Sequence, residues 1–261
     1  MRVNLFEFED FSWFPDVIRS GGTDFVRYFL IQTELYKPTV PLIEETLTKI
    51  NEFKIIDLCS GGGGAIEHVY QELNNRSKQK ISITLTDKYP NIKAFQFLKI
   101  KTKCGINYLN TSIDAMDVPK DLKGFRTMFS AVHHFQPDQV KKILRNAVEN
   151  RDGLGLFDGG EKSIIAFLGI LIIHPIAFLI FTPFFKPFNF SRLFYTYLIP
   201  LIPIYTIWDG LVSILRMYQP EELMKLAESL NSDNYIWICG KTRNRFGIRA
   251  TYLIGYPKSD N

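Results

Sequence analysis

The sequence predicts an α/β fold with a doubly wound, mostly parallel sheet of seven strands. Five short apolar runs between positions 54 and 157 alternate with helical patterns of about ten residues, which is typical of consecutive strand–helix–strand units. The first run ends in four glycines at positions 61–64, which suits a buried strand that turns into a helix. Two runs joined by a short loop close the chain and predict one antiparallel strand at the sheet edge.

Each expected element follows from its local pattern. The strands are short apolar runs bounded by glycine or polar residues, and the last helix carries Pro220 in its first turn. Before about residue 50 the pattern is helical and rich in aromatic residues. The expected strands are 54–59, 81–86, 108–113, 126–132, 153–157, 235–239 and 249–254, and the expected helices between and after them are 65–73, 91–101, 137–149 and 220–230.

The composition is that of an ordered protein. Of 261 residues, 46% are apolar and 22% are charged, which excludes disorder. The net charge of +4 is too weak to indicate nucleic-acid binding. Three scattered cysteines form neither a metal-binding pair nor a disulfide framework, and the acidic residues in the first twenty positions do not fit a signal peptide. We therefore expect a cytoplasmic location.

Apolar residues are concentrated in one block, residues 163–208. No charged residue lies between Lys162 and Lys186, and a second uncharged run ends at Asp209. Such runs are long enough to span a bilayer, but four prolines interrupt them, and aromatic residues cluster around the connector that joins them. Three interpretations stay open: a monotopic element that contacts a membrane, a soluble cap over an apolar pocket, and a spanning hairpin.

The block divides the expected organisation into three parts. Residues 1–50 would form a helical N-terminal lid, residues 51–162 and 209–261 the sheet domain, and residues 163–208 an apolar insertion beside the carboxyl edge of the sheet.

The strongest local signal is the glycine cluster after the first strand. A phosphate-binding Walker loop would need Gly-Lys-Ser/Thr at its end, and this loop continues as Gly64-Ala65. A dinucleotide-binding GxGxxG pattern fails in both registers, because its third glycine would fall on Ile66 or Glu67. The remaining pattern is an acid followed by Gly-x-Gly, which Asp57, Gly61 and Gly63 meet.

With this pattern the chain resembles the class I S-adenosylmethionine (SAM)-dependent methyltransferases, over residues 50–160 and again over 218–256. The resemblance implies a Rossmann-like fold, SAM as cofactor, and an acid after the second strand that binds the ribose. It also implies an acid and a small residue after the third strand at the adenine, with Met116 packed on the ring. The cofactor-binding residues so implied are Asp57, Ser60, Gly61, Gly62, Gly63, Asp87, Lys88, Asp114, Ala115, Met116 and Ala131. Asp87 and Asp114 also have a simpler interpretation as helix caps or solvated turn residues.

Three residues are candidates for catalysis. His133 and His134 follow the fourth strand, where the resemblance places the methyl donor, and either could act as a general base. A metal site is not expected, because adjacent residues on an extended chain point to opposite faces. Asp209 emerges from the apolar block and would act as a base if burial raised its pKa; its simpler interpretation is the cap of a following helix, with Arg216 and Tyr218 on the helix surface.

We therefore expect methyl transfer from SAM to an apolar small molecule or a lipid-like acceptor, with the insertion at a membrane surface. A non-catalytic SAM-binding protein is the main alternative. A nucleic-acid methyltransferase is less favoured, because no Asn/Asp-Pro-Pro-aromatic motif follows the fourth strand and no dense basic stripe is present.

Overall fold

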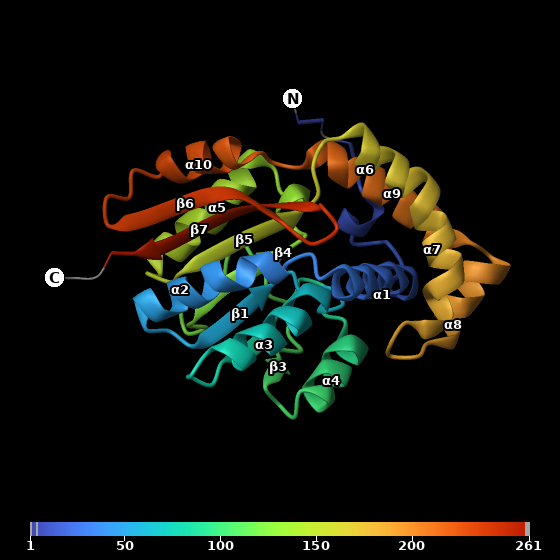
Figure 1. Ribbon diagram of the computed structural model, residues 1–261, viewed down its shortest axis with the longest axis horizontal. Helices are drawn as coiled ribbons and strands as arrows, with labels where there is room; N and C mark the ends of the chain where they lie inside the picture. The colour runs from blue at the N-terminus through green and yellow to red at the C-terminus, as the bar shows by residue number, and fades with distance from the viewer. Residues whose placement is uncertain (1, 4, 259–261) are drawn as a thin grey trace.

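The computed structural model describes residues 2, 3 and 5–258 and confirms the α/β fold class (Figure 1). A single sheet of seven strands has the order β3-β2-β1-β4-β5-β7-β6. The strands are β1 (Lys54–Leu58), β2 (Ser82–Leu85), β3 (Ile106–Tyr108), β4 (Phe125–Phe129), β5 (Leu154–Gly159), β6 (Tyr235–Arg243) and β7 (Arg249–Pro257).

The direction of the strands follows the prediction. The ladders between β1 and β2, β1 and β4, β2 and β3, and β4 and β5 are all parallel. β7 pairs antiparallel with both β5 and β6, so it is the strand that runs opposite to the rest. It lies one position inside the edge, and β6 forms the edge itself.

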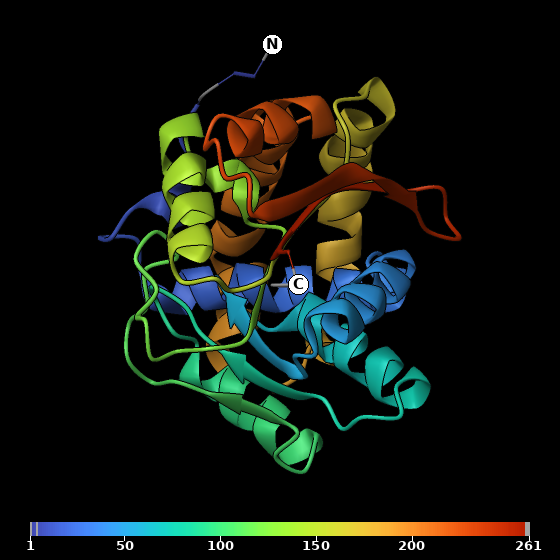
Figure 2. The same cartoon turned by 90° about the vertical axis from the view of Figure 1, so that its left-hand side faces the viewer.

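Helices cover both faces of the sheet (Figure 2). Successive strand residues alternate between the two layers: Ile55 packs among residues of α2, α3 and α4, and Ile56 among residues of α5 and α10. α5 and α10 each begin with proline and a reciprocal capping box. The helices of the sheet domain are α2 (Val40–Ile50), α3 (Gly64–Arg76), α4 (Ile92–Lys101), α5 (Pro137–Glu149) and α10 (Pro220–Glu228), and α1 (Asp16–Thr33) lies across one end.

Two strands differ from the prediction in their bounds. β3 covers 106–108 rather than 108–113, because only Ile106–Tyr108 pair with β2 and the polar residues that follow leave the ladder. β4 ends at Phe129 rather than at position 132. Ser130 adopts a left-handed backbone conformation with φ of 51°, which an extended strand does not allow, and Val132–His134 form a 3₁₀ turn.

The first half of the insertion is one continuous helical rod, Ile164–Phe184. It consists of α6 (Ile164–Leu168), a π-helical turn (Gly169–Ile173), α7 (His174–Phe181) and a 3₁₀ turn (Thr182–Phe184). The chain returns through α8 (Phe190–Leu193) and a π-helical turn (Phe194–Leu198), bends by 82° near Pro200, and continues as α9 (Leu201–Arg216). Pro175 and Pro183 lie in the first turns of α7 and of the 3₁₀ turn, where the rod changes from one type of helix to another.

α9 corrects two expectations. The expected boundary between residues 208 and 209 falls inside this helix, so the insertion and the C-terminal part of the sheet domain share one element. Asp209 therefore does not cap a following helix, because that helix already begins at Leu201.

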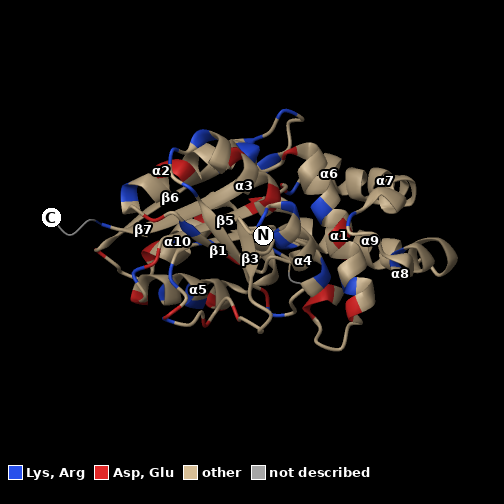
Figure 3. Ribbon diagram, turned by 90° about the horizontal axis from the view of Figure 1, so that it is seen from below, with Lys and Arg blue, Asp and Glu red and all other residues tan. Residues whose placement is uncertain are grey.

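Much of the insertion's apolar surface is exposed. Its first helix has a mean hydropathy of 2.8 over an 18-residue window, of which only 6% is buried, and among the described residues it is the one unbroken helix long and apolar enough to cross a membrane. This end of the molecule carries very few charged residues (Figure 3). The exposed side chains include Ile164, Ile165, Leu168, Leu171, Ile172, Ile173, Ile176, Leu179, Ile180, Phe184, Phe188, Phe190, Leu198 and Ile204. A soluble cap would bury such side chains in protein, and here they face outward.

The sheet domain holds a buried ion pair that gives a test of its packing. Arg126 on β4 is fully buried, and its Nη2 lies 2.6 Å from Oδ2 of Asp152, which is 6% exposed. We predict that Arg126→Ala lowers the free energy of unfolding by about 3–5 kcal/mol, because the buried Asp152 carboxylate would lose its buried partner and keep only the ion pair with the exposed Lys123, at 3.3 Å.

The exposed pair Lys49–Glu45 is the control, and Lys49→Ala should cost less than about 1 kcal/mol in the same urea titration. If the two variants lost equal free energy of unfolding, burial would not make the Arg126 pair more important for stability than an exposed pair.

Candidate functional site

The glycine turn joins β1 to α3 at the carboxyl edge of the sheet. Gly61 and Gly63 have φ of 51° and 72°, in the left-handed region that favours glycine. The N–H of Gly63 donates to the carbonyl of Ser60 over 2.6 Å, and the N–H of Ser60 donates to the carbonyl of Thr86 over 3.0 Å. The turn is thereby fixed to the end of β2.

Asp87 closes the turn from the neighbouring strand. Its Oδ2 accepts the N–H of Gly61 over 2.8 Å, and its Oδ1 accepts the N–H of Tyr89 over 2.8 Å. Burial raises the pKa of this carboxyl. Each carboxylate oxygen can accept a further hydrogen bond, so the contacts to the turn leave acceptor capacity.

The two other expected acids have different surroundings. Asp114 accepts the N–H of Met116 over 2.9 Å, and its Oδ2 lies 3.2 Å from Nζ of Lys88, which links the ends of β2 and β3 at the surface. Asp57 is buried, accepts the hydroxyl of Thr127 over 2.7 Å, and so joins β1 to β4; burial raises its pKa to about 7.

Ala115 and Ala131 are buried in one hydrophobic cluster, against which Met116 and Cys59 pack. The turn, the three acids, Ala115 and Ala131 all follow or end strands at the same edge of the sheet. The residues that the resemblance implies for SAM are therefore brought together, and their contact with a cofactor stays a prediction.

Helix α1 rests directly on the glycine turn. A Cβ on Gly62 would lie 2.8 Å from the carbonyl oxygen of Thr23, and one on Gly64 would overlap the backbone of Arg27. These two glycines are thus explained by helix packing. Two surface cavities, of about 440 and 160 Å³, are lined by other segments, and no residue of the glycine turn lines either of them.

Arg19 of α1 stands beside the residues that follow β2. Its guanidinium lies 4.5 Å from the ring centroid of Tyr89, and its Nη1 and Nη2 are engaged by Asp16 and the carbonyl of Phe11. Its Nε is buried without a hydrogen-bond partner. A buried, unpartnered donor on a cation next to Asp87 is what an anionic group of a ligand would satisfy.

His133 forms a pair with an acid on the neighbouring strand. Its Nδ1 lies 2.8 Å from Oδ1 of Asp158, at the end of β5, and its backbone N–H donates to Oδ2 over 3.1 Å. The carboxylate therefore holds the imidazole in one orientation. Among residues 2, 3 and 5–258, nothing forms a hydrogen bond with its Nε2.

His134 enters a different network, made with the N-terminal strap, residues 5–14. Its Nδ1 lies 2.8 Å from Asp10 and 3.2 Å from Glu7, and Arg216 approaches the same two carboxylates at 2.7 and 3.3 Å. Burial opposes protonation of His134, but the carboxylates of Glu7, Asp10 and Glu9 outweigh it and raise its pKa to about 10. At neutral pH this histidine is a cation.

Asp209 holds the strap from the other side. Its carboxylate accepts the N–H groups of Phe8 and Glu9 over 2.8 and 3.1 Å. Burial and the nearby Glu9 raise the pKa of Asp209 to about 8, as expected for a buried carboxylate at this place. The strap thus brings Asp209 and His134 into one network.

The two histidines do not lie on an extended chain, as the sequence analysis expected. The chain at Val132–His134 is a 3₁₀ turn rather than an extended strand, and the two imidazole rings lie with centroids 4.4 Å apart. Ligand atoms of Glu7, His133 and His134 lie within 4.8 Å of one another, but Nη1 of Arg216 is 3.3 Å from Oε1 of Glu7 and opposes a cation there. The absence of a metal stays a prediction.

Sequence reasoning missed several residues of this site. Asp158 directly follows the expected strand 153–157 but belongs to no motif, and Glu7 and Asp10 lie far from the histidines in the chain. Arg216 and Tyr218, taken as helix surface, are both buried, because the strap and Arg2 cover them. The sequence gives little indication that these two residues are buried, because an arginine is expected at the surface unless its ion-pair partners are known.

Comparisons with known proteins establish the class of fold. No protein-family model and no curated protein matches the sequence. The structure is similar to an O-methyltransferase family protein from Burkholderia thailandensis, with 12% identity, a TM-score of 0.50, and coverage of 92% of this chain and 60% of that one. It is also similar to the methyltransferase domain of bacterial CtHen1 (13% identity, TM-score 0.50, 86% of this chain and 100% of that one).

Magnesium protoporphyrin IX methyltransferase from Synechocystis PCC 6803, solved with bound S-adenosylhomocysteine (SAH), is a third neighbour, at 13% identity and a TM-score of 0.50, covering 93% and 99% of the two chains. At this identity the likeness concerns the fold. The resemblance to class I SAM-dependent methyltransferases is confirmed at that level.

Gly62 provides a test of the contact between α1 and the turn. We predict that Gly62→Ala lowers the free energy of unfolding by about 1–3 kcal/mol, because the new methyl would press against the backbone of Thr23. Gly169→Ala is the matched control: a Cβ there meets nothing within 4 Å, and alanine should be neutral or stabilising in its helix. Equal stability of Gly62→Ala and the unchanged protein would contradict this packing.

The network at His134 makes stability depend on pH. Its pKa is raised from 6.5 to about 10 in the folded protein, so the folded state binds a proton that the unfolded state has lost in this interval. The stabilisation is complete below pH 6.5 and is lost as the pH rises toward 10.

Urea unfolding at a series of pH values should show this fall, and His134→Gln should flatten it. Parallel curves for the two proteins would mean that His134 carries no bound proton in this range.

Proposed function

We propose that the protein transfers the methyl group of SAM to an apolar, lipid-like acceptor at a membrane surface. One observation carries the proposal: the glycine turn closed by Asp87 and the His133–Asp158 pair both stand at the carboxyl edge of the sheet, at the ends of β1, β2, β4 and β5. In doubly wound sheets ligands bind outside this edge.

The residues at this edge fit SAM in chemistry. Asp87 keeps acceptor capacity for ribose hydroxyls, and Asp114 stands after the next strand with Met116 beside it. The unpartnered Nε of Arg19 would meet the carboxylate of the methionine part. Helix α1 packs against the glycine turn, so this helix would form part of the wall of the site. When bound, SAM supplies an electrophilic methyl group on a sulfonium.

The surroundings of the two histidines support different roles for them. Asp158 engages Nδ1 of His133, so Nε2 is the atom that would take a proton from the acceptor. His134 is already protonated at neutral pH and would not serve as that base. We assign it a positioning role: together with Asp209 it holds the N-terminal strap against the site.

The apolar character of the acceptor is inferred from what surrounds this edge. Exposed apolar side chains of the insertion continue onto the strap, where Phe6 contacts Trp208 with ring centroids 5.3 Å apart. Contiguous apolar surface of this kind marks a membrane or partner contact. The 82° bend before α9 favours an element that lies on the membrane over a hairpin that spans it.

A product search tests the proposal. Purified protein is incubated with methyl-labelled SAM and a total lipid extract, and labelled products are separated and identified by mass spectrometry. We expect a labelled lipid-soluble product that forms with the unchanged protein and with Lys142→Gln, a surface control on α5.

His133→Gln should lower the rate by roughly 10²–10⁴-fold, because the proton acceptor is lost. SAM binding by calorimetry without any labelled product would favour the non-catalytic alternative. Near-normal turnover of His133→Gln would remove this residue from catalysis.

A further inference from the structure

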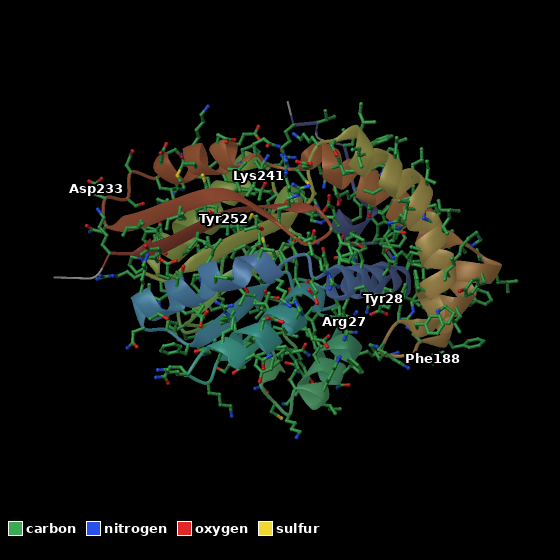
Figure 4. The ribbon with its side chains drawn as sticks, in the orientation of Figure 1. Arg27, Tyr28, Phe188, Asp233, Lys241 and Tyr252 are labelled. Atoms are coloured by element: carbon green, nitrogen blue, oxygen red, sulfur yellow. The ribbon has the colours of Figure 1, made fainter. Side chains whose placement is uncertain are left out.

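A small cavity lies where α1, α4 and the connector of the insertion meet. Its volume is about 160 Å³. Figure 4 shows Arg27 and Tyr28 of α1 on the side of the molecule that carries Phe188 of the connector. We refer to this cavity as the Arg27 pocket. It is lined by Asp24, Arg27, Tyr28, Ile31, Gln32, Lys101, Phe184 and Lys186.

Positive charge exceeds negative charge in and directly behind this pocket. Arg27, Lys101 and Lys186 line it, and Arg192 lies behind it in an ion pair with Asp24. The second carboxylate, Glu67, is shared by Arg27 and Lys101. Four cations thus face two carboxylates, and an anion would restore the balance.

Arg27, which lines the pocket, has one donor without a partner among the described residues. Arg27 is only 4% exposed; its Nη1 donates to the carbonyl of Lys186 and its Nη2 lies 2.5 Å from Oε2 of Glu67. Its Nε is buried without a hydrogen bond, and so is Oδ1 of Asp24, whose other oxygen is paired with Arg192. A buried guanidinium N–H without an acceptor is costly, and a phosphate oxygen is a strong acceptor for it.

The position of the pocket indicates the source of the anion. Phe184, the last residue of the exposed apolar helix, lines it, and Phe188 and Phe190 of the adjoining connector are 62% and 73% exposed. If this helix lies in the interface of a membrane, its end is at the depth of the lipid headgroups. The anion available at that depth is the phosphate of a phospholipid.

We infer that the Arg27 pocket binds the phosphate of a phospholipid whose headgroup carries no cation, because Lys101 and Lys186 would repel the choline of a neutral lipid; the pocket thereby directs the protein to anionic membranes. Nε of Arg27 and the ammonium groups of Lys101 and Lys186 bind the headgroup, while Phe184 lies beside the acyl chains. This inference rests on the proposed membrane contact. It adds a lipid preference and the residues that set it, and it does not depend on which acceptor is methylated.

Vesicle flotation tests the inference. The full-length protein is mixed with vesicles of phosphatidylcholine alone, or of equal parts phosphatidylcholine and phosphatidylglycerol. We expect stronger binding to the anionic vesicles. The double variant Lys101→Gln/Lys186→Gln should lose roughly tenfold in affinity for anionic vesicles and keep its affinity for the neutral ones.

A matched variant controls for general charge. Lys142→Gln/Lys225→Gln removes two exposed lysines from α5 and α10, away from the insertion, and should keep the anionic preference. Lys186→Gln alone, with an exposed side chain, tests the pocket without disturbing Glu67, and should also weaken anionic binding.

The outcomes separate the two proposals. Equal binding to both vesicle types, or equal loss in the pocket and control variants, would overturn the Arg27 pocket as a lipid site and leave the membrane contact standing. Absence of binding to either vesicle type would overturn the membrane contact on which the inference rests.

Discussion

The contact between helix α1 and the glycine turn is the constraint on which the rest of the structure depends. Gly62 and Gly64 lack the side chains that would keep this helix away, so α1 lies directly on the turn that the resemblance assigns to SAM. The same helix carries Phe25, whose ring contacts Phe178 of the insertion, and Asp24, which pairs with Arg192. One helix therefore joins the expected cofactor turn to the exposed apolar element.

The second organising feature is a network of buried and half-buried charges that the N-terminal strap completes. Glu7 and Asp10 meet His134 and Arg216, and Asp209 receives the strap's backbone N–H groups. Charges taken out of water are stable only when their partners are in place, so this network forms only when the strap docks. The strap thereby covers the end of β4, and the His133–Asp158 pair beneath it is shielded from solvent.

The features that could be predicted from the sequence are those that short stretches of the chain determine. The alternation of apolar runs and helical patterns predicted the fold class and a mostly parallel sheet, and the spacing of Asp57, Gly61 and Gly63 predicted the turn. Asp87 was implied by the resemblance, from its place after the second strand. β4 was extended too far because the left-handed conformation of Ser130 has no signature in an apolar run. Asp209 was misplaced because a proline-containing run hid the start of α9. The partners of His134 lie more than 120 residues away in the chain, and no local pattern indicates that they meet.

We propose the carboxyl edge of the sheet, closed by Asp87, as the site that binds SAM. Calorimetric titration with SAH tests it most directly, on the unchanged protein, on Asp87→Ala, and on Asp233→Ala, an exposed acid at the far end of the molecule (Figure 4). The account predicts saturable binding that Asp87→Ala weakens roughly 10–100-fold and Asp233→Ala leaves unchanged. No binding of SAH by the unchanged protein, or equal binding by Asp87→Ala, would contradict it.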